Sequence, residues 1–176
     1  MSEVSLLVYL MNEAFDGVGI EESNESQSLM ANLAGVDARA WRARPDGHVR
    51  TIESIALHVA SCKAMYREYA FGGRSLTWES PEVQPWAEGH SPMAAALDWL
   101  RQTHERLVAD VSALTDEDLV RPRFANWGEL RETRWLLSML LQHDAYHAGE
   151  INHIRSGFAG EDRWNWQIVA GIDPLA

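Results

Sequence analysis

The sequence predicts an all-α fold. Apolar residues recur with a period near 3.6 in four separate segments, whereas the strict alternation of a strand is weak throughout the chain. Residues that start and stop helices flank these segments. Four amphipathic helices are typical of a four-helix bundle. With 176 residues, 46% of them hydrophobic, the chain can bury one core, so we expect a single domain over residues 1–176.

The first two helical regions have clear boundaries. The first covers residues 3–35 and is expected to break at Gly17 and Gly19, because glycine readily leaves the helical conformation. Thr51 is a candidate N-cap for the second helix, which ends near residue 70.

The later helices follow from similar signals. Ser91 as N-cap and Pro92 at the first helical position predict the start of the third helix. A short helix follows it and is stopped by Pro122. The fourth helix is expected to start between residues 126 and 133 and to stop at Gly157. Its length of about 25 residues corresponds to roughly 37 Å, enough to line a whole side of a bundle.

Two connecting segments are unusual for a bundle. Residues 71–90 form a long connection, and long connections in compact domains are either functional or disordered. Trp78 and Trp86 favour an ordered segment that either lines a cleft or seals the bundle. After the fourth helix, Trp164 and Trp166 predict a tail that folds back onto the domain, because indoles are seldom left wholly in water.

Composition excludes several classes of partner. The chain carries 26 acidic against 15 basic residues, a formal charge of -11, which argues against a nucleic-acid partner. Seven acidic residues precede Arg39, the first basic one, so we expect no signal or transit peptide. The apolar run at residues 6–11 is too short to cross a membrane. A single cysteine, Cys62, fits a reducing compartment, and we therefore expect a cytoplasmic protein.

Two histidines on the predicted fourth helix indicate a metal site. His143 and His147 are one helical turn apart on an otherwise apolar stripe, and two imidazoles placed in a core need partners. His58 on the second helix and His104 on the third are candidates for a third ligand. The alternative is that each histidine is an ordinary core residue with a hydrogen-bonded neighbour.

Three imidazoles around one divalent cation, with one position left to water, are typical of a catalytic zinc site. Cys62, one turn beyond His58, is either a thiolate ligand or a small buried apolar residue. Glu150 and Asp144 are the candidates for catalytic residues. Each carboxylate would act on metal-bound water, orient a ligand imidazole or remain solvated.

Two segments make the chain resemble a known family. Residues 57–60, Leu-His-Val-Ala, and residues 143–151, His-Asp-Ala-Tyr-His-Ala-Gly-Glu-Ile, resemble the DinB-like (DinB/YfiT-like) metal-binding family. Residues 33–36 and 114–119 extend this resemblance. It implies an up-down-down-up four-helix bundle, often dimeric, in place of the up-down-up-down order that short loops would favour.

The resemblance also implies that His58, His143 and His147 bind zinc or nickel. It places no ligand on the third helix, so we expect His104 to be a hydrogen-bonded core residue.

The resemblance further suggests a reaction. Characterised members include mycothiol-dependent maleylpyruvate isomerase and bacillithiol S-transferases, which implies a metal-dependent thiol S-transferase or isomerase acting on a small molecule. Arg50, Arg67 and Arg74 are candidate donors for acidic groups of the thiol, or else ordinary solvated residues. One alternative is a stress-associated metal-binding or interaction protein without turnover. The other is a metal-dependent hydrolase, for which the sequence shows no evident acid/base partner.

Overall fold

The computed structural model describes residues 1–17, 27–44, 49–87 and 89–160, and confirms the all-α fold. The long helices of the bundle are α1 (Glu3–Asp16), α4 (Ile52–Phe71), α5 (Met93–Ser112) and α6 (Thr133–Ala159). Shorter helical segments are α2 (Leu29–Leu33), α3 (Ala38–Arg42) and the 3-10 helix η1 (Asp116–Val120). Strands β1 (Pro122–Phe124) and β2 (Leu130–Glu132) pair antiparallel in a small hairpin before α6. In the described part of the chain, no helix is both long enough and apolar enough to cross a membrane.

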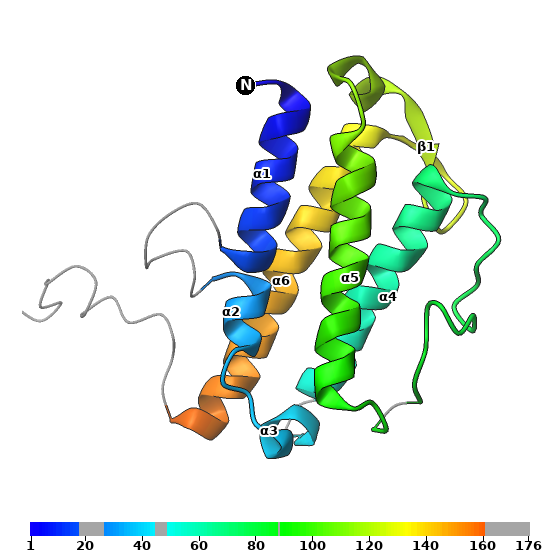
Figure 1. Ribbon diagram of the computed structural model, residues 1–176. Helices are drawn as coiled ribbons and strands as arrows, with labels where there is room; N and C mark the ends of the chain where they lie inside the picture. The colour runs from blue at the N-terminus through cyan, green and yellow to red at the C-terminus, as the bar shows by residue number, and fades with distance from the viewer. Residues whose placement is uncertain (18–26, 45–48, 88, 161–176) are drawn as a thin grey trace, which may run out of the picture.

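The helices have the up-down-down-up order. Helices α1 and α6 run in one direction, and α4 and α5 run in the opposite one (Figure 1). Helix α4 packs against α5 and α6, and α1 packs against the same two helices. Because α4 and α5 are parallel neighbours, the chain must travel back along about 30 Å of helix between them. This return explains why the connection at residues 72–92 is long.

The long connection is held against the bundle. Val83 is fully buried, and its carbonyl accepts a hydrogen bond of 2.7 Å from the Ser61 hydroxyl of α4. Trp86 packs edge-to-face on Trp99 of α5, with ring centroids 5.8 Å apart. Trp78 is 43% exposed. Of the two roles expected for these tryptophans, lining a cleft or sealing the bundle, the contact of Trp86 with Trp99 fits the second.

Local signals explain the first helix boundaries. Helix α1 ends at Gly17, which has a φ of 74°, so the predicted break at this glycine is confirmed. Thr51 caps α4 and forms a reciprocal capping box with Ser54. The predicted break residue Gly19 and the tail tryptophans Trp164 and Trp166 lie outside the described residues.

Two predicted boundaries are wrong. The N-cap of α5 is Pro92 rather than Ser91, because the Ser91 hydroxyl instead donates a 2.5 Å hydrogen bond to the buried Glu53 carboxylate of α4. Helix α6 passes through Gly157 and ends at Ala159, followed by Gly160 with a φ of 71°. A glycine ends a helix only where the backbone turns into the left-handed region, and in α6 this happens three residues later.

The core consists of two apolar layers separated by a polar one. One apolar layer, called the lower layer, lies toward the N-terminal ends of α4 and α5 and includes Leu33, Trp41, Ile55, Val59, Leu100 and Ile151. The upper layer includes Met11, Tyr66, Leu107, Leu136 and Leu140. Between these positions along the four long helices lie four polar residues, one from each helix: Asn12, Lys63, His104 and Asp144. We call these four residues the polar layer.

Candidate metal centre

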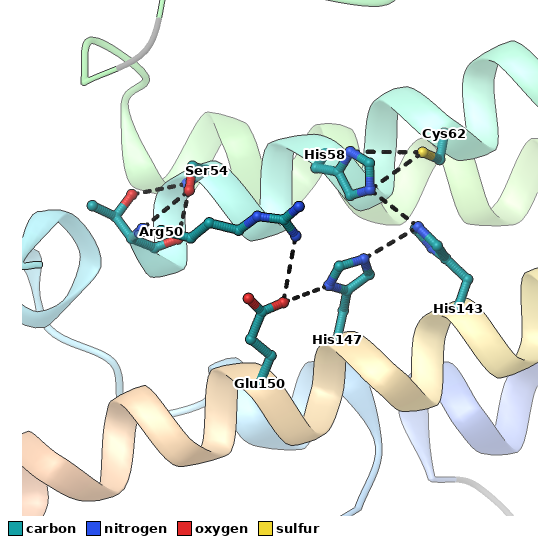
Figure 2. A network of polar contacts seen from close by, with 8 residues as sticks. Arg50, Ser54, His58, Cys62, His143, His147 and Glu150 are labelled. Atoms are coloured by element: carbon teal, nitrogen blue, oxygen red, sulfur yellow. Dashed lines mark hydrogen bonds and ion pairs between the residues drawn. The ribbon is translucent and has the colours of Figure 1, made fainter. Parts of the chain in front are cut away.

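The structure brings His58, His143 and His147 together. His58 comes from α4, and the two others come from successive turns of the antiparallel neighbour α6. The Nε2 atom of His143 lies 3.1 Å from Nε2 of His58 and 3.2 Å from Nε2 of His147 (Figure 2). One nitrogen from each ring lies within 4.8 Å of the others. Two helices are therefore sufficient to assemble the cluster.

The electrostatic environment keeps the three imidazoles neutral. Burial is the main cause that lowers the pKa of each ring below its usual value, and in His143 the pKa falls to about 3. Proximity of the rings adds to this effect for His58 and His143, because a proton on one disfavours a proton on the next. A metal ligand must be a neutral imidazole with a free lone pair, so this environment suits metal binding.

Glu150 determines which nitrogen of His147 is free. Its carboxylate accepts a hydrogen bond of 2.9 Å from Nδ1–H of His147. A carboxylate can only accept, so the ring proton lies on Nδ1 and the lone pair on Nε2 points toward His143. A hydrogen bond of this kind is the usual support of a metal-bound histidine. Of the two candidate acidic residues, Glu150 is thus the one that is hydrogen-bonded to a histidine of the cluster.

The donor atoms fit a divalent cation. Ligand nitrogens about 2.1 Å from one zinc ion at tetrahedral angles lie about 3.4 Å apart, close to the separations from His143. Without a shared cation the cluster is poorly satisfied, because three ring nitrogens face one another with few protons between them. The three histidines are therefore a credible ligand set for one metal ion.

Cys62 borders the cluster without joining it. Its Sγ atom lies 3.7 Å from Nε2 and 3.8 Å from Nδ1 of His58, beside the ring. The set of mutually close donor atoms in the described ranges contains only the three histidines. Burial raises the pKa of the thiol to about 12. These observations favour the small buried apolar residue over the thiolate ligand.

His104 and Asp144 belong to the polar layer. Lys63 donates to Oδ2 of Asp144 at 2.5 Å and to Nδ1 of His104 at 3.3 Å. Nε2–H of His104 then donates to Oδ1 of Asn12 at 3.1 Å, and the ring stacks on Phe15. His104 is a hydrogen-bonded core residue, as expected. Asp144 is only 2% exposed, which is incompatible with the solvated role and places the carboxylate inside the bundle.

The site is separate from a cavity between α1, α2 and α6. The volume of this cavity is about 500 Å³. Leu10, Asn32 and Ala145 contribute to its walls, and none of the three histidines does.

Comparison with known families agrees with this geometry. Residues 23–151 match the profile of the DinB superfamily, and this range includes the three histidines and Glu150. The chain belongs to the DinB superfamily. No curated protein matches it. Within this DinB-superfamily chain, the sequence indicated all three members of the histidine cluster, but it did not reveal Lys63.

A signal for Lys63 was available. It is the only lysine in the sequence, where every other basic residue apart from histidine is an arginine, and it lies on the predicted second helix among apolar residues. The side chain is 1% exposed. A lone charge on a core-facing helix stripe predicts a buried partner of opposite charge, although not which one.

Proposed function

We propose that His58, His143 and His147 bind one divalent metal ion, zinc or nickel, and that the protein is a metal-dependent thiol S-transferase or isomerase of the mycothiol or bacillithiol type. The observation that carries the proposal is the convergence of three neutral imidazoles without a fourth protein donor among the described residues. Such a set leaves a coordination position for an exogenous ligand, as in catalytic rather than structural sites. When bound, the metal supplies positive charge that favours the thiolate form of a thiol at neutral pH.

The chain's own residues support thiol chemistry better than hydrolysis. Hydrolysis needs a general base beside the attacking water. Glu150 is engaged by His147 and lies near Arg50, and Asp144 is paired with Lys63 in the core. A thiol needs no such base once its proton is lost, because the thiolate is itself the nucleophile. Glu150 then acts by orienting His147.

Metal binding is tested by replacing each ligand. His58→Ala, His143→Ala and His147→Ala should each lower the metal content of purified protein from about one ion per chain, and each should weaken the visible spectrum of the cobalt-loaded protein. His153→Ala is the matched control, because His153 is an exposed histidine on the same helix and outside the cluster. The proposal would be contradicted if the parent protein contained no metal after purification and gave no histidine-ligated spectrum after cobalt was added.

Turnover is tested separately. Metal-loaded protein is incubated with mycothiol, bacillithiol or glutathione and the electrophile monochlorobimane, and the conjugate is measured by fluorescence. We expect conjugation with at least one thiol above the level of the His147→Ala variant. Equal rates for the parent and this variant with all three thiols would favour a metal-binding protein without turnover.

A further inference from the structure

Arg50 is the one of the three candidate arginines that the structure brings to the histidines. Arg67 instead pairs with Asp110 at 2.6 Å, and the guanidinium of Arg74 lies over the ring of Phe124. Arg50 directly precedes the N-cap of α4. Its side chain extends toward the cluster and ends between His58 and Glu150 (Figure 2).

The guanidinium of Arg50 has unused hydrogen-bonding capacity. Its contact with Glu150 is an ion pair of 3.6 Å, longer than a hydrogen bond, while the same carboxylate oxygen accepts the 2.9 Å hydrogen bond from His147. The Arg50 side chain is 48% exposed. A guanidinium carries five N–H donors in a planar fork that matches an oxyanion. Arg50 is thus a half-exposed cation beside the cluster, with N–H donors that no hydrogen bond within the described residues engages.

With a divalent ion bound, the local charge would be opposite in sign to that of the chain. A divalent ion (+2), Arg50 (+1) and Glu150 (-1) would together carry a formal charge of +2, because the histidines are neutral. The chain as a whole carries -11. Burial is the main cause of the lowered pKa in all three imidazoles, and the positive charge of Arg50 adds to it in each one. A positive spot on an acidic protein attracts and orients anionic ligands.

We propose that the site selects thiols that carry an anionic group, a carboxylate or a sulfonate, and that Arg50 is the residue that recognises this group. This inference rests on the proposed function, because the thiol sulfur is placed at the metal. Glu150 keeps its role toward His147, so Arg50 can turn its free N–H groups to the ligand without loss of the metal site.

The test compares two thiols of similar size on cobalt-loaded protein. Mercaptopropanesulfonate carries a negative charge on a group that is a poor metal ligand, and mercaptopropanol is neutral. Dissociation constants are read from the change in the cobalt spectrum. We expect the parent to bind the sulfonate about threefold to fivefold more tightly, the size of a half-exposed charge interaction. Arg50→Met should abolish this preference, and Arg50→Lys should retain part of it.

Two controls separate recognition from damage. Arg67→Met removes the same charge from within α4, at a site already paired with Asp110, and should keep the preference. Arg50→Met should bind cobalt no more weakly than the parent, because the change removes a positive charge beside a cation. A parent without cobalt binding would overturn the metal proposal and this one together. A cobalt-binding parent without a preference, or an Arg50→Met variant that keeps it, would overturn the role of Arg50 alone.

Discussion

Lys63→Met should strongly destabilise the fold, because it leaves a carboxylate without its partner in the core. Lys63 and Asp144 are 1% and 2% exposed, and their charged atoms are 2.5 Å apart. Oδ1 of Asp144 has no hydrogen-bond partner among the described residues, so Lys63 supplies the compensation of that carboxylate. The same change removes the donor to Nδ1 of His104.

The expected loss follows from the burial of the pair. Removing one member of a buried ion pair costs about 3–5 kcal/mol, because the remaining charge is unpaired and dehydrated. For a chain of 176 residues this corresponds to a fall in Tm of about 6–20 °C. Replacing both members by apolar residues is often neutral. The double variant Lys63→Met/Asp144→Leu should therefore recover most of the loss, to within about 1 kcal/mol of the parent.

The assay is urea unfolding followed by helical circular dichroism, with a chelator present so that metal binding does not contribute to the free energy of unfolding. The parent, both single variants and the double variant form a complete cycle. The coupling free energy between the two positions should be large, since each single variant leaves the other charge buried without its partner. A double variant as unstable as Lys63→Met alone would refute the reasoning, because it would show that the loss arises from packing or from the unpaired Nδ1 of His104 rather than from the unpaired carboxylate.

Three further predictions concern Glu150, Cys62 and His104. Glu150→Leu should weaken cobalt binding by about 10- to 100-fold. Glu150→Gln should weaken it less, because the amide oxygen, unlike a leucine side chain, can still accept the hydrogen bond from His147. Equal losses for the two variants in a cobalt titration would contradict this role of Glu150. Cys62→Ala should leave cobalt affinity nearly unchanged, and the parent should lack a near-ultraviolet sulfur-to-cobalt band, whose presence would make Cys62 a ligand.

The prediction for His104 concerns pH. Burial is the main cause that lowers its pKa to about 2, and Lys63 and Arg101 add to the shift. As the pH falls below about 6.5, His104 takes up a proton in the unfolded chain but stays neutral in the folded chain. The contribution of His104 to the free energy of unfolding is therefore fully present above this pH and decreases below it. By pH 5 the loss is about 2 kcal/mol. His104→Gln should remove this part of the pH dependence of urea unfolding, and a ring that titrates by NMR above pH 5 would contradict the assignment.

The sequence was most informative where a local rule determines the structure. Gly17 ends a helix and Thr51 begins one through contacts within a few residues, so the local sequence was sufficient to locate both boundaries. His143 and His147 lie on one face because of the helical period, which is equally local. The place of His58 beside them was implied by resemblance, since nothing in the spacing of 85 residues relates α4 to α6.

The remaining features depend on how the helices pack. The polar layer requires the rotation and register of four helices, so its hydrogen bonds could not be derived from Lys63 or Asp144 separately. Ser91 is a residue type that is favoured at N-caps, but its hydroxyl instead donates to the buried Glu53 carboxylate of another helix. Strands of three residues such as β1 and β2 are too short to show alternation.

Burial of the single lysine also affects how this protein can be handled. Reagents that acylate primary amines, and enzymes that attach groups to lysine, need an accessible ε-amine. Lys63 is the only lysine and is sealed inside the bundle. The folded protein therefore offers no lysine for amine coupling, and acylation of Lys63 becomes a direct signal that the bundle has opened.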